Sequence, residues 1–202
     1  MISTIQALQK YLLKGADGFD ELMMTSPGCT REKIRELKKA LPDIPDSYTK
    51  WVEAVTLNGI VVGYFSVSTC SYHSNDIVAN LIEGNRAGVM FCEQMQKYHL
   101  YAIGNTSNFG IFVATASSPH KEGEIIAIDE NIYAEKYNAE QWIYRLAKDF
   151  EQFLIIAGNV NQLHREIKKD DSNYDEKKEE FLERLKILGV AEEYHKSWLL
   201  FF

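Results

Sequence analysis

The chain has 202 residues, with 22 lysines and arginines against 29 aspartates and glutamates, so its formal net charge is -7. A chain of this length forms one domain, or one domain with an appendage, and it folds without needing a disulfide or a metal. The acidic balance argues against a general nucleic-acid binder, which needs a basic surface. No apolar run approaches the roughly 20 residues of a membrane span, and we expect no signal peptide.

The cysteines predict the compartment. There are three, Cys29, Cys70 and Cys92, an odd number at wide spacing. This pattern is typical of free thiols in a reducing environment rather than of a disulfide framework. We therefore expect a cytoplasmic protein.

The negative charge is concentrated in one part of the sequence. Residues 108–158 carry 4 basic and 8 acidic residues, so more than half of the net charge lies there. The simpler interpretation is a solvated surface, and the alternative is a face that steers a basic partner. The acidic residues of this segment are Glu122, Glu124, Asp129, Glu130, Glu135, Glu140, Asp149 and Glu151.

The first part of the chain predicts three short helices. Ser3 is the candidate N-cap of a helix over residues 4–13, and Thr30 that of a second helix, which Pro42 stops. A third helix begins at Pro45 and ends at Asn58-Gly59.

The middle of the chain predicts strands. Residues 60–68 are β-branched and aromatic and read as one strand. Residues 75–95 are helical or mixed. Three further strands are expected at residues 98–105, 109–116 and 123–128, the first two joined as a hairpin through Ser107-Asn108.

The last part predicts helices again. Apolar residues at helical spacing predict a long helix over about residues 139–158 and another over 174–188. The residues between them, 159–171, are expected to be helical but polar. The final Leu199-Leu200-Phe201-Phe202 is expected to dock on the body of the domain, with a dimer or partner contact as alternatives. The fold class expected is α+β, with a mainly antiparallel sheet, a domain over 1–158 and a helical C-terminal extension over 159–202 packed on it.

Catalytic motifs are absent from the sequence. It has no phosphate-binding glycine loop, no nucleophile elbow, no paired Cys-x-x-Cys and no His-Glu-x-x-His, so we expect no enzyme activity, no metal and no cofactor. A dyad of Cys70 or Cys92 with His73 or His99 is the remaining way to assemble a nucleophile.

Two polar segments have alternative interpretations. Residues 104–110 are rich in asparagine and glycine, which favours a hairpin turn over a cradle of amides for an anion. Glu122 and Glu124 lie two residues apart on one strand face and would act as an acid and base pair only if one were buried. Beside the turn that contains Pro119 and His120, exposure of both is the simpler expectation.

One run of residues resembles the SUKH superfamily. Residues 31–59 place an amphipathic helix before Leu41-Pro42, then Tyr48 and Trp51, then Asn58-Gly59, in the order typical of that family. The later segments are similar in order as well, and the resemblance covers about residues 30–156. The later segments with this similarity are the strand pair within 101–112, the Gly-x-Ile-x-x-Ile-Asp strand at 123–129 and the Phe-x-x-Phe-Leu helix at 150–154.

The resemblance implies an α+β domain that binds proteins and does not catalyse. Bacterial members are mostly immunity proteins that neutralise a cognate toxin, often a nuclease, and fungal Smi/Knr-type members are regulatory scaffolds. We therefore expect a protein partner, such as a basic toxin domain, with no nucleic acid and no membrane, and a monomer or weak homodimer. The candidate contact residues are Glu122, Glu124, Asp129, Glu130 and Glu135, since complementary charge speeds association.

Overall fold

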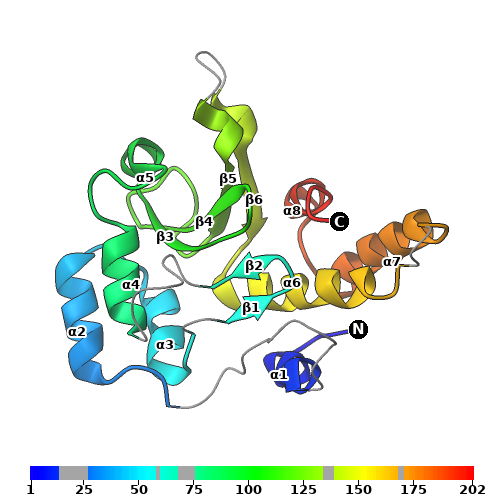
Figure 1. Ribbon diagram of the computed structural model, residues 1–202, viewed down its shortest axis with the longest axis horizontal. Helices are drawn as coiled ribbons and strands as arrows, with labels where there is room; N and C mark the ends of the chain where they lie inside the picture. The colour runs from blue at the N-terminus through cyan, green and yellow to red at the C-terminus, as the bar shows by residue number, and fades with distance from the viewer. Residues whose placement is uncertain (14–26, 58–59, 68–75, 134–138, 168–170) are drawn as a thin grey trace.

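A computed structural model describes residues 1–13, 27–57, 60–67, 76–133, 139–167 and 171–202. In these ranges eight α-helices flank one antiparallel sheet, which confirms the expected α+β class (Figure 1). None of these helices is long and apolar enough to cross a membrane. The helices are α1 (Ile5–Leu13), α2 (Arg31–Ala40), α3 (Asp46–Ala54), α4 (Ile77–Gly84), α5 (Cys92–Tyr98), α6 (Phe150–His164), α7 (Tyr174–Ile187) and α8 (Glu192–Trp198).

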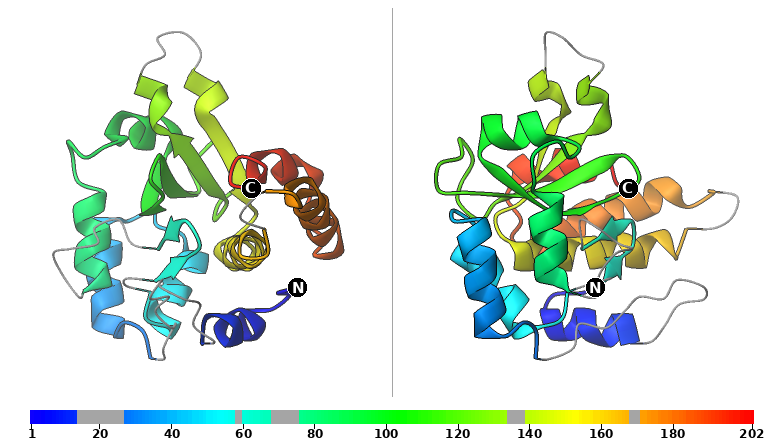
Figure 2. Two further views of the ribbon diagram at one scale, coloured as in Figure 1. Left: turned by 45° about the vertical axis from the view of Figure 1, so that its right-hand side comes forward. Right: turned by 60° about the vertical axis from the view of Figure 1, so that its left-hand side comes forward.

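The sheet is a six-stranded meander in which every strand pairs with its neighbour in the sequence. It curls strongly, as the views of Figures 1 and 2 show. Consecutive strand signals in the sequence predict antiparallel strands with short connections of this kind. The strands are β1 (Val61–Val62), β2 (Phe65–Ser66), β3 (Leu100–Asn105), β4 (Phe109–Ala114), β5 (Ile125–Asp129) and β6 (Ile143–Ala147).

Both faces of the central strands are buried, so the sheet separates two hydrophobic cores. Alternate residues of β4, such as Ile111 and Val113, join the main core with the helices α2, α3, α4 and α6. The intervening Phe112 and Ala114 join a second, smaller core, which α5 and the 3₁₀-helix η1 (Glu130–Tyr133) cover.

The first helices begin near the predicted positions. Thr30 caps α2, and its hydroxyl accepts the amide hydrogen of Lys33 at 3.4 Å. At α1 the cap is Thr4 rather than Ser3, because the Thr4 hydroxyl accepts from the amide of Ala7 at 3.1 Å.

The prediction of one strand over residues 60–68 is wrong. Residues 61–66 form a tight hairpin of β1 and β2, with Val62 opposite Phe65. Gly63 makes the turn possible because its φ is +61°, a conformation that most side chains disfavour. The predicted end of the third helix is also wrong, because α3 ends at Ala54 and Val55 is extended, while Asn58-Gly59 itself lies outside the described residues.

The long helix predicted over residues 139–158 is also wrong. Residues 139–142 form the 3₁₀-helix η2, residues 143–147 form β6, and α6 starts only at Phe150. Pairing with β5 overrides the helical spacing, since Ile128 faces Ile143 and Ala127 faces Tyr144 in the sheet. The Asp149 carboxylate then starts α6 by accepting the amide of Gln152 at 2.8 Å.

The last residues dock on the body of the molecule, as expected. Phe201 and Phe202 are each only 7% exposed. The Phe201 ring lies 4.8 Å from that of Phe109 on the hairpin, and the Phe202 ring stacks on Phe181 at 5.2 Å. Two far-apart parts of the sequence, the β3–β4 hairpin and the C-terminal segment, are thereby held together.

Candidate functional site

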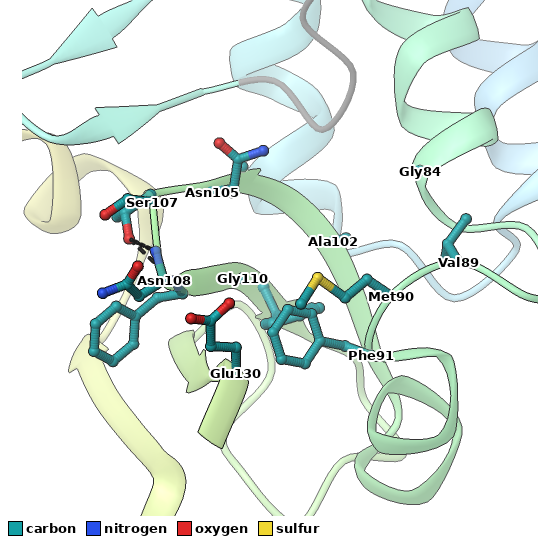
Figure 3. A pocket seen from close by; sticks show the side chains of 14 residues that line it. Gly84, Val89, Met90, Phe91, Ala102, Asn105, Ser107, Asn108, Gly110 and Glu130 are labelled. Carbon is teal, nitrogen blue, oxygen red and sulfur yellow. Dashed lines mark hydrogen bonds between the residues drawn. The ribbon is translucent and has the colours of Figure 1, made fainter. Parts of the chain in front are cut away.

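A pocket of about 380 Å³ opens beside the β3–β4 hairpin, at the edge of the second core (Figure 3). A volume of this size is within the range of small-ligand and side-chain pockets. It is lined by the hairpin, by the loop before α5 and by the start of η1. The lining residues are Gly84, Val89, Met90, Phe91, Ala102, Gly104, Asn105, Thr106, Ser107, Asn108, Phe109, Gly110, Phe112 and Glu130.

The floor of the pocket is aromatic. The rings of Phe91 and Phe112 meet edge to face, with centroids 5.6 Å apart and an interplanar angle of 83°. Gly110 allows this arrangement, since a Cβ atom there would lie 2.5 Å from the Phe112 ring and 3.0 Å from that of Phe91. The absence of a side chain at Gly110 therefore shapes the floor.

Phe91 is held in an unusual conformation. Its φ is +64°, in the left-handed region that bulky residues rarely adopt. Its amide donates a hydrogen bond to the Tyr133 hydroxyl, and the two rings lie 5.5 Å apart. Burial raises the pKa of Tyr133, so the hydroxyl stays neutral at physiological pH. Backbone strain of this kind is concentrated at functional positions.

The other side of the pocket is polar. The Glu130 carboxylate lies between the hairpin turn and Met90 in Figure 3, and the Glu130 amide donates to the Asn108 carbonyl at 3.0 Å. Glu130 has no ion-pair partner in the part of the chain that the structure describes. An unpaired carboxylate thus stands next to an aromatic floor.

The turn at residues 105–109 is a hairpin turn rather than an anion cradle. The amides of Asn108 and Phe109 both donate to the Thr106 hydroxyl, at 3.3 and 3.1 Å. These amides are therefore already used, and Glu130 beside them would repel an anion. The sequence interpretation that favoured the turn is confirmed.

Two large apolar side chains stand at the rim. Met90 is 57% exposed and Tyr133 is 53% exposed. Glu93 lies close enough to Tyr133 that its charge contributes to raising the pKa of that hydroxyl. Sequence analysis missed Met90, Phe91 and Tyr133. The only signal for these residues in the sequence was the pair of glycines Gly84 and Gly88. They interrupt the helical pattern at the end of α4 and precede a short apolar stretch that belongs to neither α4 nor α5.

The structure separates the predicted acidic contact residues. Glu122 and Glu130 are exposed, whereas Asp129 is 8% exposed and Glu124 is fully buried. Asp129 accepts both the backbone and side-chain amides of Asn131 at 2.8 Å. Glu135 lies outside the described residues. The expected exposure is wrong for Glu124. Because its carboxylate has no solvent-exposed surface, it cannot contact a partner.

Glu124 is the centre of a buried ionic cluster. Arg145 Nε and Nη2 lie 2.7 and 2.6 Å from its Oε1, and the Tyr194 hydroxyl donates to the same oxygen at 2.8 Å. Arg145 also pairs with Glu193 in α8 through two hydrogen bonds, of 3.0 and 3.1 Å. His120 Nδ1 stands 4.0 Å from Oε2, and burial lowers the pKa of that imidazole. These contacts saturate Oε1 and join β5, β6 and α8.

The residues considered for catalysis are not assembled. Burial of Glu124 meets the condition for an acid and base pair with Glu122, but Arg145 and the Tyr194 hydroxyl already occupy its Oε1, while Glu122 is exposed. Cys92 and His99 line a common cavity of about 200 Å³, but they stand at opposite ends of α5, about 10 Å apart along the helix axis. The Cys92 sulfur accepts from Gln96 instead, at 3.6 Å.

Cys70 and His73 lie outside the described residues. Across the ranges that the structure does describe, no three histidines, cysteines or carboxylates lie where they could hold a metal ion together.

Comparison with known proteins gives no relative. No protein-family model matches the chain, and neither a curated protein nor a solved structure gives a significant match. Function is therefore inferred from the geometry of the chain itself.

Proposed function

We propose that this protein is a protein-binding domain without catalytic activity, which neutralises a toxin by covering its functional surface. The contact surface is the Met90 face, formed by Met90 and Glu130, which line the pocket, together with Tyr133, which packs on Phe91, and Glu93 near Tyr133. The observation that carries the proposal is this combination of exposed apolar side chains with unpaired carboxylates. Resemblance of residues 30–156 to the SUKH superfamily supports immunity as the biological role.

The chemistry of the Met90 face suits a basic partner. Methionine and tyrosine are enriched where proteins bind other proteins, because they offer large and adaptable apolar contacts. Glu93 and Glu130 are both exposed, and they add negative charge to a molecule whose net charge is already -7. A toxin domain that acts on nucleic acid carries a basic surface, so complementary charge would steer the two together.

A regulatory scaffold that binds through the C-terminal extension is the second candidate. It receives less support, because most large apolar residues of that extension face inward. Among the residues of the extension that the structure describes, the large hydrophobic side chains open to solvent are Ile187 and Leu200, at 62% and 50% exposed.

Charge reversal on the Met90 face tests the proposal. The partner to use is the product of the reading frame next to this gene, if that frame encodes a toxin, and the variant is the double substitution Glu93→Lys with Glu130→Lys. We expect a 1:1 complex that inhibits the toxin, and about tenfold slower association of the variant at low salt, with a weaker salt dependence. Stopped-flow or surface-plasmon measurements give the association rate.

The matched control is Glu179→Lys, an exposed carboxylate on α7, away from the pocket. It changes the net charge without changing the Met90 face, so its association rate should stay close to that of the wild type. Absence of any complex with the toxin contradicts neutralisation. A complex whose kinetics respond equally to Glu179→Lys and to substitutions on the face contradicts the choice of surface.

A further inference from the structure

We propose that the pocket on the Met90 face binds an arginine side chain, with the guanidinium on the aromatic floor and against Glu130. That the arginine belongs to a protein partner rests on the proposed function. The preference of the pocket for a guanidinium follows from the lining residues alone. The pocket combines an aromatic surface, one unpaired carboxylate and unused hydrogen-bond acceptors, and each of these excludes some ligands.

The aromatic floor selects a flat or apolar group. Phe112 is fully buried and supports Phe91 from behind, so the small exposed part of the Phe91 ring, which is 6% exposed as a whole residue, is the aromatic surface open to a ligand. Val89 and Ala102 extend this patch. A guanidinium stacks on such rings and is less strongly hydrated than an ammonium, so burial costs arginine less than lysine.

The carboxylate selects a cation. Glu130 lines the pocket, and its main chain is fixed by the hydrogen bond from its amide to Asn108. Arg86, which follows the lining residue Gly84 by two positions in the sequence, pairs with Glu83 at 2.7 Å. A carboxylate accepts two parallel hydrogen bonds from a guanidinium, which a lysine cannot supply.

The remaining acceptors match the remaining donors of the guanidinium. The side chains of Asn105, Ser107 and Asn108 line the pocket and make no hydrogen bond among the described residues. An arginine has five N–H donors, of which Glu130 accepts two. Asparagine and serine oxygens at the hairpin are placed to accept others.

Met90 completes the pocket as an adaptable lip. It lines the pocket while remaining 57% exposed, so its thioether chain is free to close over the aliphatic part of an inserted side chain. The arginine would then be covered by Met90, supported by Phe91, and held at its end by Glu130.

A titration of the whole protein with a capped arginine, N-acetyl-arginine amide, tests the inference. Amide and methyl NMR signals of Met90, Gly110 and Glu130 should shift in a saturable way. Capped citrulline has nearly the same shape without the charge and should bind at least tenfold more weakly. Capped lysine should also bind more weakly, because it loses the stacked, bidentate geometry.

Two variants locate the binding site. Glu130→Gln should weaken arginine binding about tenfold, and the matched control Glu179→Gln should leave it unchanged. Both residues are exposed, so unfolding midpoints near the wild-type value are expected and confirm that the comparison is between folded proteins.

The outcomes separate this inference from the proposed function. Equal binding of arginine and citrulline, or equal binding to the wild type and Glu130→Gln, overturns the guanidinium site. Signals that do not move with arginine overturn the pocket as an arginine site, even if the toxin complex forms. Conversely, arginine binding at the pocket together with failure of toxin binding leaves the site in place and removes only the proposed role.

Discussion

Glu124 is a fully buried carboxylate whose partners come from distant parts of the chain. Arg145 follows it by 21 residues and the Tyr194 hydroxyl by 70. The sequence places Glu124 next to a polar turn, and nothing local indicates that a guanidinium and a phenol close over it. A side chain's exposure is a property of the assembled fold, and here the acidic segment is part solvated surface and part structural ion pair.

Removal of Arg145 is expected to destabilise the protein. Arg145→Met leaves the Glu124 carboxylate buried with only hydrogen bonds to stabilise its charge. Loss of one partner of a buried pair costs about 3–5 kcal/mol, and we expect the lower end because the Arg145 side chain is 32% exposed. Urea unfolding at pH 7 measures the change in the free energy of unfolding.

Two further variants give the controls for Arg145→Met. Glu193→Gln removes only the exposed carboxylate of the cluster and should cost less than about 1 kcal/mol. Adding Glu124→Leu to Arg145→Met removes the stranded charge and should restore part of the lost stability. A loss below about 1 kcal/mol for Arg145→Met would show that the pair is unimportant for folding.

At the scale of single elements, local signals and pairing signals compete. The Thr30 cap and the two prolines predicted the start and end of α2 and the start of α3, because such signals act within a few residues, whereas α3 ends at Ala54, before the predicted Asn58-Gly59. Trp142, Leu146 and Phe150 recur every four residues and predicted a helix, yet pairing with β5 makes residues 143–147 a strand. Pairing partners far away in the sequence cannot be read from a short window, which is why this prediction failed.

The candidate site follows the same division. The hairpin through Ser107-Asn108 was predictable from its asparagine and glycine content. The pocket beside it was not, since its other wall comes from Val89, Met90 and Phe91, and their placement depends on the second core. Sequence analysis identified Glu130 by its charge alone and did not predict the aromatic floor of the pocket beside it.

Gly110→Ala tests how the β3–β4 hairpin shapes this pocket. The new methyl group would lie 2.5 Å from the fully buried Phe112 ring and 3.0 Å from the Phe91 ring, so at least one of them must shift. Overpacking of this kind costs about 1–3 kcal/mol, so a lower urea midpoint and shifted Phe91 and Phe112 ring signals are expected. Ser107→Ala, in the same hairpin, should change stability by less than about 0.5 kcal/mol. Equal stability of both variants would contradict this role of Gly110.

On the scale of the whole molecule, residues from both ends of the chain complete the main core. The Ile2 backbone is held by the Asn159 side chain in α6 through hydrogen bonds of 3.1 and 2.7 Å. Trp198 in α8 is fully buried, and its indole donates to the Leu146 carbonyl of β6 at 2.6 Å. The C-terminal segment therefore covers the sheet edge that β6 presents, and the Met90 face stays open on another side of the molecule.

Deletion of residues 171–202 is expected to unfold the rest of the chain rather than trim it. The deletion exposes Phe65 and Phe153, whose rings lie 5.5 and 5.9 Å from Trp198, and it removes the Glu193 and Tyr194 contacts of the ionic cluster. Loss of several aromatic residues, each worth about 3–5 kcal/mol when truncated in a core, exceeds the stability of a typical domain. Near-ultraviolet circular dichroism and urea unfolding should show no cooperative transition, whereas Leu200→Ala, at a side chain 50% exposed, should retain it. A truncated chain that unfolds cooperatively near the wild-type midpoint would instead make the segment a separable appendage and revive its use as a scaffold.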